Sequence, residues 1–196
     1  MKITVKIGLL FAAIWIAIKM ILFLTVSGEA RFNVTPAIML NILCLLLAIT
    51  VGLYLHKRRQ TEYTNALGDI KSAMSSAMIY AAIVAGFIYL YYNNIDPEFN
   101  RHQISEAEVQ IDKVLNDPEQ LKQLKASNED FEVKTVPELR KMLMDNQKAI
   151  FSPGSTMTIS LLAMLVLGTL NSIFVTVIMR RVVFRQPRSN SSPRAS

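Results

Sequence analysis

The chain has 196 residues, of which 52% are hydrophobic and only 18% are charged, and its net charge is +6. A soluble globular domain carries about 25% charged residues, so this chain is short of charge and rich in apolar side chains. Its seven glycines and seven prolines exclude a collagen-like or low-complexity chain. The single cysteine, Cys44, excludes an intrachain disulfide framework and any CxxC metal or redox motif.

Four stretches are long and apolar enough to cross a bilayer. A hydrocarbon core about 30 Å thick needs roughly 20 apolar residues in a helix, and open strands would leave backbone groups unpaired in lipid. Buried helices of soluble proteins are shorter and show a polar face. The expected transmembrane helices cover residues 7–26, 34–54, 73–92 and 157–179.

The distribution of lysine and arginine predicts the orientation. Residues 95–156 contain twelve acidic and eight basic side chains, a net charge of −4, whereas the rest of the chain carries +10. Basic residues next to spans are retained in the cytoplasm, so we expect both termini inside and residues 95–156 outside. The excess of basic residues is therefore explained mainly by membrane orientation, and we do not expect nucleic acid as a partner. The polar tail, residues 182–196, is expected to be disordered.

A cleaved signal peptide is the alternative for the first span. Lys2 and Lys6 precede the apolar run, and Val26-Ser27-Gly28 follows it. The run is too long for a typical signal and is interrupted by Lys19, so we favour a retained span. Cleavage would leave the sidedness of the other three spans unchanged.

The segment between the third and fourth spans is predicted to be helical and amphipathic. One motif is a capping box, with Ser at the N-cap and Glu three positions on, a second is an Asp-Pro pair, and a third is the run Thr135-Val136-Pro137-Glu138. These expected helix starts are Ser105, Thr135 and Asp117. About 60 residues with few large apolar side chains make a marginal independent core. We expect a small cap of helices, and the alternative is an apolar stripe that docks a partner helix.

Lys19 is the most informative single residue. An ionised lysine within a span costs from about 3 to more than about 10 kcal/mol. At about 1.5 Å per residue, Lys19 lies some 10 Å from the outer end of its span, and Asn41 lies at a similar depth in the next, so the two can meet. One interpretation is an ion, proton or headgroup site. We favour a structural lysine that snorkels outward or bonds Asn41 and backbone carbonyls, because the expected spans contain no Asp or Glu for a transport pathway.

Small residues recur about every four positions on the third span and on a related stripe of the fourth. This spacing lets helices approach closely. The candidate packing face comprises Ala73, Ala77, Ala81, Ala85, Gly168 and Ser172. We expect it to join the third and fourth spans within one chain, and homo-oligomerisation through the same face is the alternative.

The sequence contains no motif that points to catalysis, a cofactor or a metal. His56 and His102 are expected on opposite sides of the membrane, which disfavours a two-histidine metal centre, and Cys44 is expected to be an inert buried thiol. GxSxG, HExxH and P-loop motifs are absent. We therefore expect no catalytic residue, no cofactor, no metal ligand and no enzymatic activity.

Two segments carry a resemblance to a known family. Asn65-Ala66-Leu67-Gly68 leads into the small-residue span, and the run YYNNIDPEF, Tyr91–Phe99, closes it. The chain resembles a domain-of-unknown-function family of small four-helix membrane proteins common in Bacteroidota, whose third span similarly ends in Tyr and an Asp-Pro-Glu-Phe-like turn. The resemblance covers nearly the whole chain. It implies a bacterial inner membrane and a periplasmic outer segment, and it supplies no activity.

The sequence thus predicts an all-α, four-transmembrane-helix bundle with a helical extracytoplasmic insert between the third and fourth helices. The expected parts are residues 1–94 with three spans, the periplasmic insert 95–156, the fourth span 157–181 and the tail 182–196. The leading hypothesis is a non-enzymatic membrane component that binds a protein partner, a second copy or a lipid of the bilayer. The alternative is a small transporter or channel that uses Lys19. A membrane enzyme acting on lipid is the weakest hypothesis.

Overall fold

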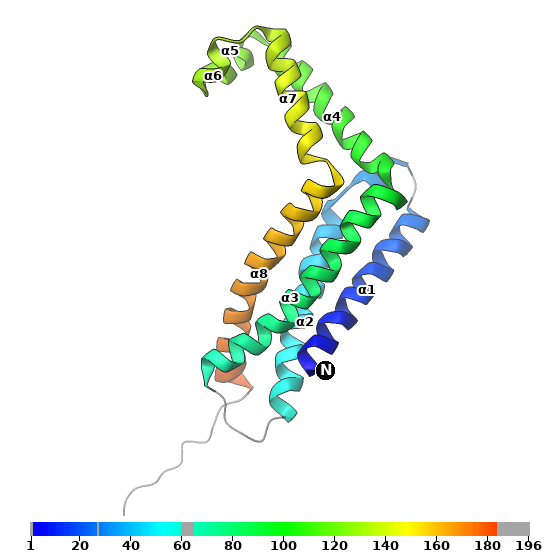
Figure 1. Ribbon diagram of the computed structural model, residues 1–196, viewed down its shortest axis with the longest axis vertical. Coiled ribbons are helices and arrows are strands. Elements are labelled where there is room, and N and C mark those ends of the chain that lie inside the picture. The colour runs from blue at the N-terminus through cyan, green and yellow to red at the C-terminus, as the bar shows by residue number, and fades with distance from the viewer. Residues whose placement is uncertain (1, 27, 60–64, 184–196) are drawn as a thin grey trace, which may run out of the picture. The chain divides into compact units, whose positions relative to one another are not determined.

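The computed structural model of the protein describes residues 2–26, 28–59 and 65–183 (Figure 1). Within these ranges every regular element is a helix and no strand occurs. The all-α fold class is therefore confirmed. The predicted tail lies outside the described residues from 184 onward.

Four of the helices are long and apolar enough to cross a membrane. They are α1 (Ile3–Thr25), α2 (Thr35–Arg59), α3 (Ala66–Leu90), which continues through the π-helical turn η2 (Tyr91–Ile95), and α8 (Pro153–Val182). Their most apolar 18-residue windows have mean hydropathies between 1.8 and 2.5. Helix α8 begins before the expected span because Pro153 fits the first turn of a helix, where its missing N–H costs nothing. These helices are those of a multi-pass membrane protein.

The chain divides into two compact units, and each long helix contributes a part to both. The first unit comprises Met1–Ile14, Asn41–Ala81 and Met164–Ser196, and the second comprises Trp15–Leu40 and Ala82–Ala163. Each unit has its own buried core, so each is described by itself.

Small residues bring the helices of the first unit into close contact. A Cβ atom added to Gly168 of α8 would lie 2.9 Å from the Cβ of Ala77 on α3, and one added to Gly52 of α2 would overlap the Ser76 hydroxyl. That hydroxyl donates a hydrogen bond to the carbonyl of Thr4 on α1 (3.0 Å). Close backbone approach through small residues is a common way for helices to pack in lipid, and here it joins α1, α2, α3 and α8.

A buried carboxylate links three helices in the first unit. Asp69, in the first turn of α3, has a side chain only 1% exposed. Lys57 of α2 lies 2.8 Å from its Oδ1, and Arg180 of α8 lies 2.9 Å from its Oδ2. The expected third span began at residue 73 and therefore left this acid out. The helix begins seven residues earlier, at Ala66. Its first two turns include polar residues, so they lie outside the apolar run that defined the expected span.

Helices α4 to α7 form the predicted insert and belong to the second unit. They are α4 (Pro97–Asn116), α5 (Pro118–Ala126), α6 (Glu129–Glu132) and α7 (Val136–Ile150). Helices α4 and α7 run side by side (Figure 1). Ile111 and Leu115 of α4 pack with Leu139 and Met144 of α7 in a buried cluster. The apolar stripe is thus covered within the chain, which favours the helical cap over a stripe left open for a partner helix.

Two of the three predicted helix starts in the insert are confirmed. The Asp117 side chain accepts hydrogen bonds from the backbone N–H groups at the start of α5, and Thr135 and Glu138 form a capping box on α7. The start predicted at Ser105 is wrong, because this residue lies in the middle of α4. The helix begins at Asp96, whose carboxylate accepts a hydrogen bond from the Phe99 N–H (3.3 Å).

Arg140 of α7 forms surface ion pairs with two acidic residues of α4. Its guanidinium donates hydrogen bonds to Asp112 (2.7 and 3.0 Å) and to Glu108 (2.7 Å). Hydrogen bonds from this cation hold the pKa of Asp112 below its ordinary value. The link supplements the apolar cluster beneath it.

Candidate functional site

Lys19 lies on the part of α1 that belongs to the second unit, and its side chain is half-buried. Its Nζ atom is 4.7 Å from the ring centre of Tyr91 and 6.0 Å from that of Tyr92. Such a cation–π contact is worth about 0.5–2 kcal/mol. Within the described part of the chain, no hydrogen bond or ion pair reaches this ammonium. The aromatic faces therefore contact the charge directly, and no carboxylate of the described residues pairs with it.

The π-helical turn η2 places Tyr91 beneath Lys19. The Asp96 N–H bonds back to the Tyr91 carbonyl at 2.8 Å, a wider turn than that of an α-helix. The Tyr91 ring is 2% exposed and packs edge-on against Phe23 of α1, with 5.8 Å between ring centres. Tyr91 is therefore a core residue.

Asp96 is a second buried carboxylate, with 1% of its surface exposed. Arg31 binds it with two hydrogen bonds, from Nη2 to Oδ1 (2.5 Å) and from Nε to Oδ2 (3.2 Å). The Tyr91 hydroxyl donates to Oδ2 (3.2 Å), and the Phe99 N–H donates to Oδ1. Four donors therefore hold one carboxylate, and the bidentate pair fixes the orientation of the guanidinium.

A small cavity of about 70 Å³ opens between these groups. Its walls are formed by Lys19, Leu22, Phe23, Val26, Arg31, Asn33, Pro36, Ala37 and Tyr91. We call it the Lys19 cavity. Two cations and two aromatic rings line it, and the described lining includes no carboxylate, thiol or imidazole. This arrangement can bind a small anion.

Asn41 belongs to the first unit and has partners there. Its side-chain oxygen accepts a hydrogen bond from the Tyr80 hydroxyl (2.6 Å), and its side-chain nitrogen lies 3.5 Å from the Met164 sulfur. Tyr80 is fully buried. The predicted contact between Asn41 and Lys19 stays a prediction, and the amide is satisfied without it.

The comparisons with known proteins identify a family. A family model described as "Protein of unknown function (DUF4199)" matches residues 6–181, which include all four long helices and the insert. The chain belongs to this family. Comparisons with curated proteins and with solved structures found no match. Membership of DUF4199 therefore adds no activity, and the helical fold rests on the structure itself.

The small-residue face of this DUF4199 chain is covered from within. All six predicted residues are buried: Ala73, Ala77, Ala81, Ala85, Gly168 and Ser172. In the first unit Gly168 meets Ala77, and the Ser172 hydroxyl bonds to the Gly168 carbonyl (2.6 Å). These contacts favour packing within one chain over self-association through the same face.

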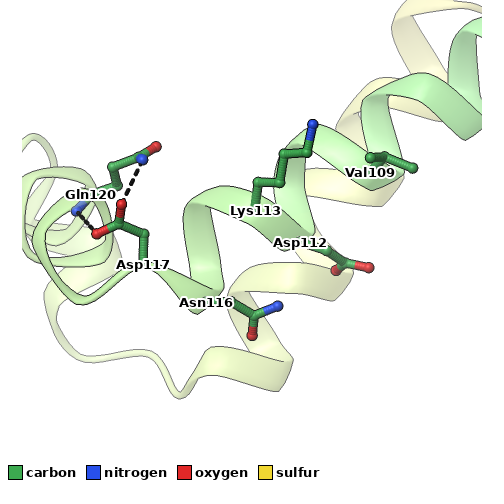
Figure 2. Close-up of a pocket in the computed structure, with 6 residues that line it drawn as sticks. All are labelled: Val109, Asp112, Lys113, Asn116, Asp117 and Gln120. Atoms are coloured by element: carbon green, nitrogen blue, oxygen red, sulfur yellow. Dashed lines mark hydrogen bonds between the residues drawn. The ribbon is translucent and has the colours of Figure 1, made fainter.

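The larger depressions on the insert are less suited to binding. Figure 2 shows one of about 770 Å³ at the junction of α4 and α5. Its Asp117 is bound to Gln120, and its Asp112 is bound to Arg140. The depression is open, and its carboxylates are already paired. Among the described residues, no three His, Cys, Asp or Glu side chains are grouped to hold a metal ion.

Sequence reasoning found Lys19 and missed the residues around it. Arg31 entered only the summed charge outside residues 95–156, and Asp96 appeared only in the run that carries the family resemblance. The Asp96-Pro97 pair is itself a helix-start signal of the kind recognised at Asp117-Pro118. No local signal indicates that Arg31 binds Asp96, because the two lie 65 residues apart.

Proposed function

We propose that this DUF4199 protein is a non-enzymatic component of a bacterial inner membrane that binds a lipid at the Lys19 cavity. The proposal includes the orientation that the charge distribution favours, with both termini in the cytoplasm and residues 95–156 in the periplasm. The observation that carries the proposal is the Lys19 ammonium, which lines a cavity shared with Arg31 and has no acceptor within the described residues. A bound anion would supply that acceptor.

The depth of Lys19 suits a lipid headgroup. Helix α1 ends at Thr25, six residues beyond Lys19, which is about 9 Å at 1.5 Å per residue. A long lysine side chain extends toward the interface from this depth. With the proposed orientation, the Lys19 cavity opens at the level where outer-leaflet lipids carry their polar groups.

The covered faces of the molecule favour a lipid over a protein partner. The apolar stripe of the insert packs in its own core, and the small-residue face packs against other helices of the chain. The Lys19 cavity, at about 70 Å³, accepts a small group and not a helix. A lipid can place a small polar group in it while its chains stay in the bilayer.

Transport is the second candidate, and the charge of Lys19 within a membrane helix is the observation that favours it. A transporter predicts flux of a charged solute into proteoliposomes that Lys19→Met abolishes. The binding proposal predicts no such flux. Anionic and cationic dyes or radiolabelled ions, tested with empty liposomes as the control, separate the two.

Native mass spectrometry tests the proposed function. The protein is extracted from its own membranes in a mild detergent, and retained lipid is read from the mass of the intact chain. We expect one lipid per chain in the wild type, its loss in Lys19→Met and its retention in Lys113→Met, which removes an exposed lysine of α4. A wild type without lipid, or equal retention in Lys19→Met, would overturn the proposal. Conversion of the retained lipid during incubation would contradict the non-enzymatic role.

A further inference from the structure

We propose that the group bound in the Lys19 cavity is the phosphodiester of an outer-leaflet phospholipid, held by Lys19 Nζ and Arg31 Nη1. The inference rests on the lipid-binding function proposed above and specifies which part of the lipid is recognised. It follows from the donors that face the cavity, from its charge and from its size.

The donors that remain free are those that a phosphate needs. A lysine ammonium carries three N–H donors, and none of them meets an acceptor among the described residues. Asp96 occupies Nε and Nη2 of Arg31, which leaves Nη1. Glu98 Oε2 lies 3.8 Å from Nη1, an ion-pair distance but beyond hydrogen-bond distance, and that side chain is 70% exposed. The non-bridging oxygens of a phosphodiester can accept from both cations at once.

The charge balance selects a single negative charge. Two cations line the Lys19 cavity, and the buried Asp96 compensates the charge of Arg31. Glu98 lies 3.8 Å from Arg31 Nη1 but is 70% exposed, so water screens its charge, and the charge of Lys19 is left without a buried counter-charge. Charges removed from water interact strongly, and an unpaired one is costly. A phosphodiester carries one negative charge and restores neutrality. A phosphate monoester, with about −1.5 to −2 at neutral pH, would exceed it.

The size of the cavity indicates which part of the headgroup can enter it. A volume of about 70 Å³ equals that of roughly two water molecules in the liquid. This space suits a phosphate group and not the alcohol attached to it. Leu22 and Val26 form an apolar wall next to the cations, along which the glycerol and acyl chains can lie. We therefore expect the site to accept different headgroup alcohols.

Binding to chosen lipids tests the inference on the full-length chain. The delipidated protein is titrated with five lipids in detergent and followed by native mass spectrometry. The lipids are phosphatidylglycerol, phosphatidylethanolamine, phosphatidic acid, a sulfonate-bearing glycolipid and diacylglycerol. We expect the two phosphodiesters to bind within about threefold of each other and at least about tenfold more tightly than diacylglycerol, the gain of a charge-assisted hydrogen bond. Inorganic phosphate at millimolar concentration should not displace them.

Substitutions at Lys19 keep the test independent of folding. Lys19→Met places an apolar side chain in an apolar helix, so it should fold, and it should bind phosphatidylglycerol about tenfold more weakly. Lys19→Arg keeps the cation and should retain binding, and Lys113→Met serves as the control. Solid-state NMR of the wild type with 15N-labelled lysine in bilayers detects the contact directly. The Nζ signal of Lys19 is identified as the one that Lys19→Met removes. We expect lipid 31P to dephase this signal.

The failures can be told apart. Tighter binding of phosphatidic acid than of phosphatidylglycerol, or no 31P dephasing at Lys19, would overturn the phosphodiester while leaving lipid binding in place. Displacement by inorganic phosphate would overturn the lipid as the source of the phosphate. Binding of none of the lipids would remove the proposed function and the inference together.

Discussion

Arg31 and Asp96 form a bidentate ion pair that joins the connection between α1 and α2 to the start of α4. The same carboxylate begins α4 through the Phe99 N–H and accepts a hydrogen bond from Tyr91. One buried acid therefore positions both the first turn of the insert and the guanidinium that lines the Lys19 cavity. The pair couples the stability of this region to the geometry of the candidate site.

Loss of the Arg31 guanidinium should destabilise the protein. Arg31→Met leaves the buried Asp96 without its cation, and breaking such a pair costs about 3 kcal/mol. The measurement is the free energy of unfolding in detergent, with Arg101→Met, an exposed arginine of α4, as the control. The double variant Arg31→Met/Asp96→Asn should recover part of the loss. A loss below about 1 kcal/mol in Arg31→Met would mean that the pair contributes no more than a surface ion pair.

The Asp69 cluster predicts an order of effects in the first unit. Asp69→Asn leaves both Lys57 and Arg180 without this carboxylate, whereas Arg180→Met leaves Lys57 in place. We expect a loss of about 3 kcal/mol for Asp69→Asn and a smaller loss for Arg180→Met. Thermal unfolding of the two variants, compared with Asp145→Asn at an exposed site of α7, measures the order. The reverse order would contradict a central role for the carboxylate.

Two glycines on neighbouring helices provide a matched test of packing. Gly168→Ala would bring a methyl group 2.9 Å from Ala77, while Gly86→Ala would meet no atom within 4 Å. Overpacking costs about 1–3 kcal/mol, so Gly168→Ala should lower the free energy of unfolding by that amount. Gly86→Ala should leave it unchanged or raise it by up to about 1 kcal/mol, because alanine favours a helix. Similar losses of unfolding free energy in both variants would show that the close approach of α8 to α3 is not the cause.

The Arg140–Asp112 link predicts acid sensitivity of the contact between α4 and α7. The pKa of Asp112 is lowered in the folded protein by hydrogen bonds from Arg140. Its contribution to stability is therefore fully present above the unfolded-state pKa of about 4 and is lost as the pH falls through the folded-state pKa. Amide exchange within residues 97–150 of the full chain should stay slow from neutral pH to about pH 5 and should accelerate below the unfolded-state pKa once the intrinsic pH dependence is removed. Arg140→Met should abolish much of this dependence, and an unchanged profile in that variant would contradict the assignment.

Local properties explain what the sequence predicted correctly. Apolar runs identify the long helices because the bilayer sets their length, and Asp117 and Thr135 cap helices through hydrogen bonds to their own next turn. Ser105 has the same local spacing and is not a cap, because the helix that starts at Asp96 already runs through it. A local motif shows that a helix can begin at a residue and does not show whether one has already begun.

The neighbours of Lys19 depend on contacts that no local pattern encodes. The cost of a lysine within a span marks Lys19 as unusual, but its contact with Tyr91 joins residues 72 positions apart. Arg31 and Asp96 pair across 65 residues, and Tyr80 meets Asn41 across 39. Such pairs follow from how the helices pack, so the sequence identified single polar residues and missed their partners.

The sidedness of the insert tests the central claim most directly. Cys44 is the only cysteine and is buried, so a Cys44→Ser background allows single cysteines to be placed on either side of the membrane. In spheroplasts, a membrane-impermeant maleimide should label Lys122→Cys on α5 at once and Ser196→Cys only after the membrane is permeabilised. Labelling of Ser196→Cys in intact spheroplasts, or protection of Lys122→Cys, would contradict the proposed orientation, on which the outer-leaflet lipid site depends.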